Sequence, residues 1–210
     1  MMSMRYIQQG LITALRKKGI SSGSVLRAMA AVPRHLFVSE ALRYHAYDDI
    51  SLPIGHGQTI SKPSVIAHMV QALELTGDEW VLEIGTGSGY QAAIIAELAG
   101  SLVTMERIEE LLNRARSVLL RLGYGGIRFV HSDDFTHVKG SFDAVIVSAG
   151  ADIMPVALFD KVAPGGRLII PVGKQSSHRI KKFIKKQSGD IIEEDIGEAT
   201  FVPYIIGETA

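Results

Sequence analysis

The run Glu83-Ile84-Gly85-Thr86-Gly87-Ser88-Gly89-Tyr90 decides the fold of this chain. It follows the apolar, β-rich segment Trp80 to Ile84 and precedes a helical pattern that begins at about Gln91. Glycines at this position let the backbone turn sharply and come close to a ligand, while the start of the following helix offers unpaired N–H donors. The run therefore predicts a nucleotide-binding turn between a strand and a helix.

Outward from this turn, short β-rich apolar segments alternate with helical patterns. The firmest helix is Ile108 to Leu122, where apolar residues recur at helical spacing. Such alternation implies right-handed crossovers and an α/β fold, a Rossmann-like, doubly wound and mostly parallel sheet. We expect further strands at LVTM (102–105), IRFV (127–130), Ala144 to Val147 and RLIIPVG (167–173), and helices at Gln91 to Ala99 and Pro155 to Val162.

The two ends of the chain differ from this middle part. Upstream, the patterns predict helices at Tyr6 to Lys18, Ser24 to Ala31 and Pro63 to Leu75, with an irregular loop through Gly55 and Gly57 before the third helix. Downstream, Ile180 to Ile184 and Phe201 to Ile206, joined through Ser188-Gly189-Asp190, predict antiparallel strands that close the sheet. We expect one domain over residues 1–210, in which 1–77 is a helical and loop extension and 78–210 is the cofactor-binding core.

Composition excludes several classes of function. The 22 basic residues balance the 22 acidic ones, so net charge favours neither a nucleic-acid partner nor a membrane surface. The chain has no cysteine, which excludes disulfides and thiolate nucleophiles and fits the cytoplasm. Its N-terminal apolar stretch is too short for a signal peptide or a membrane span. The histidines lack metal-ligand spacing, so no metal site is expected.

The identity of the nucleotide rests on two acidic residues. Glu106 follows the second strand, where a carboxylate can accept both ribose hydroxyls. Glu83 suits the cationic amino-acid end of S-adenosylmethionine better than a pyrophosphate, which a carboxylate repels. Because Gly87 to Ala92 also fits the dinucleotide spacing G-x-G-x-x-A, a nicotinamide or flavin cofactor stays open, as does a turn without a ligand. Gly85 directly abuts the strand, and this register favours S-adenosylmethionine.

Several motifs together resemble the protein-L-isoaspartate O-methyltransferase family. They are VLEIGTGSGYQAA (81–93), FDAVIVSAGA (142–151), APGGRLIIPVG (163–173), VPRHLF (32–37), LPIGHGQTIS (52–61) and FVP (201–203). The glycine motif is shared by many methyltransferases, whereas IGHGQTIS followed by Lys62-Pro63 is specific to this family. The resemblance covers nearly the whole chain and implies a class I methyltransferase fold with S-adenosylmethionine as cofactor.

The resemblance also implies which residues bind the cofactor. Contacts would come from Glu83, Gly85, Thr86 and Gly87 around the methionine end, Glu106 at the ribose, and Asp133 with Asp134 at the adenine. This chain departs from the family in its Ser132-Asp133-Asp134 run, where relatives usually have Gly-Asp-Gly. A second departure is Ser64, where relatives usually carry an aromatic residue or histidine.

The implied reaction is methylation of the free carboxylate of L-isoaspartyl residues in damaged proteins and peptides, giving an ester that closes to a succinimide. A carboxylate is already ionised near pH 7, so alignment matters more than a general base. The hydroxyls of Thr59 and Ser61 suit this task, and the resemblance places Ser61 nearest the reaction. Ser61 has an alternative role as the N-cap of the helix at Lys62-Pro63. Substrate contacts are expected from Gly57, Gln58, Ile60 and Pro203.

Other functions stay open from the residues alone. They are methylation of nucleic acids or small molecules, a nicotinamide oxidoreductase, and a cofactor-binding module without activity. Cytosine C5 methylation lacks its cysteine nucleophile here, and Ser148 to Ala151 lacks the (Asp/Asn)-Pro-Pro-aromatic signature of amine methylation. The lysines between 181 and 186 predict a solvated strand rim, His56 a loop surface residue, and Arg34 either a support for the N-terminal helices or a surface ion pair. We expect a monomer that acts on isoaspartyl proteins and peptides.

Overall fold

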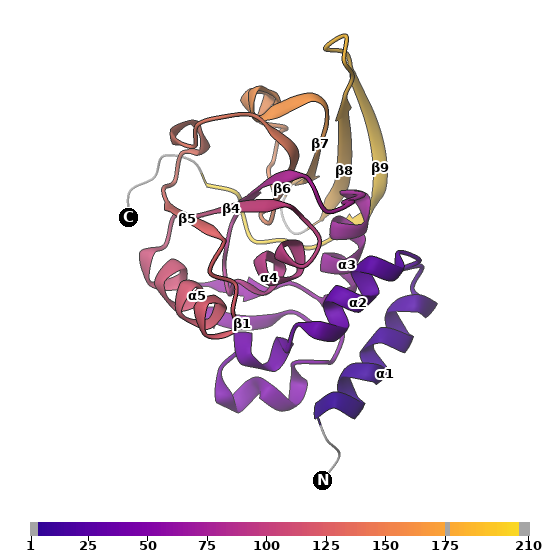
Figure 1. The fold of residues 1–210 in the computed structure, drawn as a ribbon, viewed down its shortest axis with the longest axis vertical. Helices are drawn as coiled ribbons and strands as arrows, with labels where there is room; N and C mark the ends of the chain where they lie inside the picture. Colours follow the sequence, from indigo (N-terminus) through magenta and orange to yellow (C-terminus); the bar gives the residue numbers. More distant parts are fainter. Residues whose placement is uncertain (1–3, 175–176, 206–210) are drawn as a thin grey trace.

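A computed structural model of the chain describes residues 4–174 and 177–205 (Figure 1). Its centre is a seven-stranded sheet in the order β5-β4-β3-β6-β7-β8-β9. The first five of these strands run parallel, and β8 and β9 are antiparallel additions at one edge. The strands are β3 (Trp80–Ile84), β4 (Ser101–Glu106), β5 (Arg128–His131), β6 (Phe142–Val147), β7 (Val162–Val172), β8 (His178–Lys185) and β9 (Ile191–Ala199). The predicted fold class is confirmed.

The strand order reverses between β3 and β6. From β3 the chain moves outward through β4 to β5 and then returns to β6 on the other side of β3. Both central strands are nearly all apolar because helices and loops cover both faces of the sheet, and Leu82 and Val145 have no exposed surface. Such a reversal opens a crevice at the carboxyl ends of the strands, where ligands bind in sheets of this kind.

Helices bring the N-terminal part of the chain onto the same core. One buried cluster joins Leu15, Met29 and Met69 to Ile94 of the helix after β3 and to Ala144 of the sheet. In Figure 1, α1 and α2 lie together at one end of the molecule. The α-helices are α1 (Met4–Lys17), α2 (Gly23–Ala31), α3 (Pro63–Ala72), α4 (Tyr90–Ala96) and α5 (Glu109–Arg121); 3-10 helices are η1 (Arg34–Phe37), η2 (Glu40–His45), η3 (Phe135–His137) and η4 (Val156–Lys161). In the described part of the chain, no helix has the length and apolar character needed to cross a membrane.

The segment expected to be an irregular loop contains a hairpin. Strands β1 (Leu52–Gly55) and β2 (Gln58–Ile60) pair antiparallel, with Leu52 opposite Ile60. Two residues at the turn, His56 and Gly57, have positive φ of 53° and 68°, as tight hairpin turns require. His56 is exposed, as predicted. These strands were not predicted because they are short and contain or adjoin proline and glycine, which interrupt the alternating apolar pattern.

The partner of β8 was predicted wrongly. Strand β8 pairs with β9, whereas residues 201–205 run past the end of β6, with Pro203 paired to Gly150. Ile206 lies outside the described residues. Strand β9 carries the consecutive acids Glu193, Glu194 and Asp195, of which Glu194 and Asp195 lie opposite lysines of β8. Two of the four lysines are paired: Lys181 contacts Glu193 and Asp195, while the buried Lys182 contacts Glu74, so Lys182 is not part of a solvated rim. Lys185 instead donates to backbone carbonyls.

The segment before β7 also differs from the prediction. The expected helix at Pro155 to Val162 is the 3-10 helix η4, and β7 already begins at Val162. The strand therefore includes the Pro164-Gly165-Gly166 run, at a point where its register with β6 shifts. A glycine bulge of this kind lets a strand continue through residues that usually mark a turn.

Candidate active site

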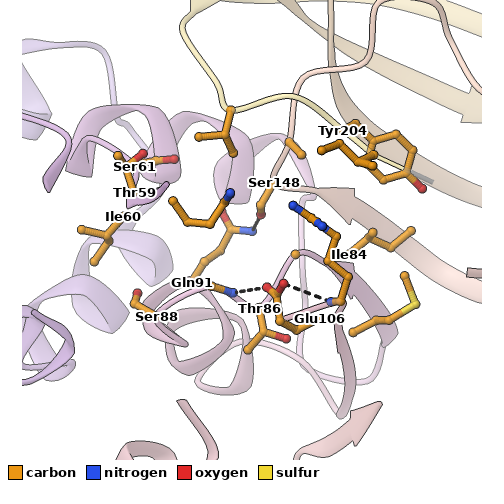
Figure 2. A pocket seen from close by; sticks show the side chains of 18 of the residues that line it. Thr59, Ile60, Ser61, Ile84, Thr86, Ser88, Gln91, Glu106, Ser148 and Tyr204 are labelled. Carbon is orange, nitrogen blue, oxygen red and sulfur yellow. Dashed lines mark hydrogen bonds between the residues drawn. The ribbon is translucent and has the colours of Figure 1, made fainter. Parts of the chain in front are cut away.

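A pocket opens at the carboxyl ends of β3, β4 and β6 (Figure 2). Its wall contains Gln58, Thr59, Ile60, Ser61, Gly85, Thr86, Gly87, Glu106, Asp133 and Pro203, all of them candidate site residues from the sequence. Three other candidates, Gly57, Glu83 and Asp134, do not line it. In Figure 2, Thr59 to Ser61 lie on one side and Tyr204 on the other, with Gln91 and Ser148 between them.

The glycine turn forms the floor of this pocket. Gly85, Gly87 and Gly89 have φ of 95°, 52° and 86°, in the left-handed region that side chains other than glycine rarely adopt. A Cβ on Gly85 would approach the Cβ of Ser148 to 3.3 Å. The glycines therefore keep the backbone of β3 and the end of β6 close together and leave room for a ligand above them.

Glu106 is held in one orientation by the backbone around it. Its Oε2 accepts the N–H of Gly87 at 2.9 Å, and its Oε1 accepts those of Arg107 at 3.0 Å and Ile108 at 3.1 Å. The side chain is 7% exposed, on the pocket wall. A fixed carboxylate, which only accepts hydrogen bonds, matches a ligand that presents hydroxyl donors such as those of a ribose.

Glu83 lies behind the pocket rather than in its wall. Its carboxyl group accepts from Gln91 Nε2 at 3.0 Å and from Thr104 Oγ1 at 2.6 Å. Complete burial raises the pKa of Glu83 to about 8, although these hydrogen bonds oppose the rise. The sequence suggested a charged partner for a cationic ligand, but the first turn of α4 covers Glu83 and puts the Gln91 amide between it and the pocket.

The Gln91 amide and two hydroxyls were missed by the sequence analysis. Gln91 Nε2 also donates to Ser148 Oγ at 2.7 Å, so one side chain ties β3, α4 and the end of β6 together. Tyr204 lines the pocket, and its buried hydroxyl has no hydrogen-bond partner among the described residues. The one feature of the sequence that could have indicated a role for Gln91 is its polar side chain on the otherwise apolar helix YQAAIIA.

The Ser132-Asp133-Asp134 run divides between two roles. Ser132 and Asp133 line the pocket, and the adenine contact expected for Asp133 stays a prediction. Asp134 instead caps η3, where its Oδ1 accepts the Thr136 N–H at 2.7 Å. The second aspartate is thus engaged by a local turn and does not line the pocket, because a short polar side chain before a helix bonds to the backbone two residues ahead.

The segment from Thr59 to Ser61 leads from β2 into α3. The N-cap residue of α3 is Lys62 and no side chain caps it, so the capping role considered for Ser61 is wrong. The Ser61 carbonyl accepts a hydrogen bond from Arg34 Nη2 at 2.7 Å. Within the described residues, the hydroxyls of Thr59 and Ser61 make no side-chain hydrogen bond, which leaves them available to a ligand.

A second cavity, which we term the side groove, meets the pocket at this segment. It is lined by Thr59, Ser61 and Val202, which it shares with the pocket, and further by Lys18, Asp49, Ser51, Lys62, Ser64, Val65, Ser177, Glu198, Ala199, Thr200 and Phe201. On its floor, Ser64 donates to Asp49 through both its backbone N–H and its hydroxyl, each at 2.8 Å. Thr59 and Ser61 therefore stand at the boundary between two cavities, where two reactants could meet.

Comparison with known proteins gives a consistent result. The family model described as protein-L-isoaspartate(D-aspartate) O-methyltransferase matches residues 6–209. A protein-L-isoaspartate O-methyltransferase of Desulfosudis oleivorans is 47% identical over 98% of this chain and 94% of its own length, and one of Photobacterium profundum is 42% identical over 99% and 100%. A Plasmodium falciparum structure described as an enzyme of this kind, in complex with S-adenosyl-L-homocysteine, superposes with a TM-score of 0.82 at 25% identity, covering 95% of this chain and 99% of that one.

Proposed function

Because the chain belongs to the protein-L-isoaspartate(D-aspartate) O-methyltransferase family, we propose that it methylates the free carboxylate of L-isoaspartyl residues with S-adenosylmethionine. The ester then starts repair of the damaged protein through a succinimide. One observation carries the proposal for the site: Thr59 and Ser61 border both the pocket at the glycine turn and the side groove. Methyl donor and acceptor would occupy the two cavities and meet at these hydroxyls.

The pocket fits S-adenosylmethionine in its chemistry. Glu106 offers a fixed acceptor for ribose hydroxyls, and the glycine turn from Gly85 to Gly87 leaves space for the methionine end. Asp133 and the hydroxyl of Tyr204, which has no hydrogen-bond partner among the described residues, supply polar groups elsewhere on the wall. When bound, the cofactor supplies a methyl group on a positively charged sulfur, which leaves as a neutral thioether as the methyl moves to the carboxylate.

The residues of the chain contribute orientation rather than proton transfer. An ionised acceptor carboxylate needs no base, whereas alignment at near-attack distance is worth about 7–11 kcal/mol in favourable cases. We assign this task to Ser61 and Thr59, whose hydroxyls can donate to the carboxylate without adding charge. Glu83 assists passively, because a buried acid with a pKa of about 8 is mostly uncharged at pH 7 and does not repel an anionic acceptor.

The peptide on either side of the isoaspartyl residue would lie in the side groove. Half of the residues that line this groove are serine, threonine or alanine, and its acids are paired: Asp49 with Lys18, and Glu198 with Arg179. Such a lining suits hydrogen bonds to a peptide backbone rather than one particular side chain. Gln58, Ile60 and Pro203 would contact the acceptor from the pocket side, while Gly57 contributes by shaping the hairpin turn.

The proposal is tested with labelled S-adenosylmethionine and two peptides that differ only in an isoaspartyl or aspartyl linkage. We expect labelling of the isoaspartyl peptide alone, with release of methanol as the ester breaks down. Equal labelling of both peptides, or of neither, would contradict the proposal. Thermal unfolding with S-adenosylmethionine or NADH separates the oxidoreductase alternative, since only the true cofactor raises the melting temperature.

We also propose that the protein acts as a monomer in the cytoplasm. The absence of cysteine fits a reducing compartment. Size-exclusion chromatography with light scattering tests the first point. A mass near twice 22.8 kDa would contradict it.

A further inference from the structure

Arg34 is a completely buried cation beneath the segment that carries Ser61. It begins η1, and its side chain has no exposed surface. Its Nη2 donates to the Ser61 carbonyl at 2.7 Å, and its Nε donates to the Ala46 carbonyl at 2.8 Å. The guanidinium group thus links the C-terminal end of η2 to the segment just before α3.

The same group also contacts the cofactor side of the site. Its central carbon lies 4.8 Å from the ring centroid of Tyr90, close enough for a cation–π interaction. Tyr90 is the first residue of α4, directly after the glycine turn, and is 1% exposed. One rigid side chain therefore bridges the acceptor segment at Ser61 and the helix that follows the cofactor turn.

Stability alone does not explain a cation in this place. Burial of a charged group is costly, and well-packed apolar replacements of buried charges are often neutral or stabilising. Burial lowers the pKa of Arg34 to about 10, against the opposing influence of Tyr90 and Asp49, so the group stays charged at pH 7. Its Nη1 is buried with no hydrogen-bond partner among the described residues, so the guanidinium is not optimally satisfied. Burial of the Arg34 guanidinium group beneath the Ser61 segment is therefore costly in stability.

We propose that Arg34 is a positioning residue for methyl transfer, which fixes the Ser61 segment at a set distance from Tyr90 and the glycine turn. The inference rests on the proposed function and adds a residue that does not itself line the pocket. Displacement of reacting groups by about 1 Å can cost about 100-fold in rate, so a device that sets the spacing of acceptor and donor has a direct effect on turnover.

The test is a double-mutant cycle between Arg34→Lys and Ser61→Ala. Lysine keeps the charge but loses the planar fork that reaches two carbonyls and the ring. We expect kcat to fall about 10-fold or more in Arg34→Lys, with the Kd for S-adenosylmethionine changed less than about twofold. In the Ser61→Ala background the same change should cost about twofold or less, because the hydroxyl that Arg34 positions is gone. Arg27→Lys, at an exposed site on α2, is the matched control and should leave kcat unchanged.

Other results would overturn the inference. If the kcat losses of the two single variants multiply in the double variant, Arg34 acts independently of Ser61 and has a general structural role. The same conclusion follows if Arg34→Lys weakens S-adenosylmethionine binding as much as it lowers kcat. If Arg34→Lys does not fold, Tyr90→Met serves instead: it removes the ring beneath the guanidinium and should lower kcat about 5-fold with cofactor affinity retained, and an unchanged kcat would overturn the inference. A wild-type protein that labels no isoaspartyl peptide would refute the proposed function itself, whereas an active wild type with fully active variants refutes only the role of Arg34.

Discussion

At the residue scale, Glu106 connects the shape of the glycine turn to cofactor binding. Its two oxygens are held by backbone N–H groups from Gly87, Arg107 and Ile108. We expect Glu106→Gln to weaken S-adenosylmethionine binding about 10-fold or more, because the amide NH2 would oppose one of these donors and hydrogen bonds to a charged group contribute about 1.5–3 kcal/mol. Isothermal titration calorimetry measures the effect. Glu110→Gln, on the exposed side of α5, should bind like the wild type, and equal Kd values for all three proteins would contradict the assignment.

Ser61 gives the complementary prediction for turnover. Its side-chain hydroxyl faces a boundary between two cavities and does not cap α3. Ser61→Ala should lower kcat by about 10- to 100-fold, the equivalent of one hydrogen bond to a charged acceptor, and leave the Kd for S-adenosylmethionine nearly unchanged. Steady-state assays with an isoaspartyl peptide check this, with Ser101→Ala at the exposed start of β4 as the control. Wild-type turnover in Ser61→Ala would leave the hydroxyl without a role in the reaction.

Single residues of the site were predictable where a local motif fixes them. The glycine turn and Glu106 follow directly from a strand-turn-helix pattern, and the structure places both in the pocket. Gln91, Ser148 and Tyr204 were missed because their positions depend on contacts between segments far apart in the sequence. Glu83 was misplaced for the same reason, since only the packing of α4 onto β3 shows that Gln91 covers it.

At the scale of elements, apolar periodicity located the buried strands and the long helices. It failed at β9, whose three consecutive acids interrupt the apolar pattern and whose pairing with β8 includes contacts to Lys181 and Lys182, and at residues 201–205, which are partly apolar but run past the pocket without forming a strand. Charge pairing across strands and contacts with a ligand pocket are tertiary effects that a one-dimensional pattern does not contain. The β1–β2 hairpin, with its glycines and proline, is a third case.

The connection between α3 and β3 provides a prediction at this scale. Glu79 accepts the N–H groups of Thr76 and Gly77, the Thr76 hydroxyl, and a hydrogen bond from Arg167. Burial alone would raise the pKa of Glu79, but the hydrogen bonds from Thr76 and Gly77 outweigh it and lower the pKa to about 2. Because this folded-state pKa lies below the unfolded value of about 4.3, the stabilisation is complete above that value and is lost as pH falls through about 2.

Glu79→Gln should therefore destabilise the fold by about 3 kcal/mol at pH 7. The difference in the free energy of unfolding between this variant and the wild type should decrease as the pH falls from about 4.5 toward 2. Urea unfolding at pH 7 and pH 3 measures both effects. Asp78→Asn changes the neighbouring, exposed acid and should have little effect at either pH. If Glu79→Gln lowers the free energy of unfolding equally at both pH values, the ionised carboxylate does not have this role.

At the scale of the whole molecule, the two parts of the chain form one core. Residues from the N-terminal extension and from the α/β core share a single buried cluster, and a second cluster with Leu82, Phe142 and Leu158 fills the other side of the sheet. The pocket likewise takes Thr59 and Ser61 from the extension and Gly85 and Glu106 from the core. The single domain over residues 1–210 stays a prediction, and it would keep together a site to which both parts of the chain contribute.

Glu83 makes the stability of this shared core depend on pH. It has no exposed surface, lies between β4 and α4, and has a pKa raised to about 8 by burial. The unfolded value is about 4.3, so between these values the folded state binds the proton that the unfolded state has lost. Stability is therefore complete below about pH 4.3, falls by up to about 1.4 kcal/mol per pH unit as pH rises, and levels off above about pH 8.

Glu83→Gln removes this titration and keeps the shape of the side chain. Its amide oxygen can still accept from Gln91, and its NH2 can donate to Thr104 Oγ1. Without cofactor, we expect the stability advantage of the variant over the wild type to grow by about 4 kcal/mol between pH 5 and pH 8 to 9, since only the wild type must ionise a buried acid there. Urea unfolding at pH 5, 7 and 9 measures the difference, and Glu110→Gln supplies a surface control that should follow the wild type. If the free energy of unfolding of wild type and Glu83→Gln changes with pH in the same way, the pKa of the buried carboxyl group is not raised on folding. Glu83 would then be an anion behind the pocket.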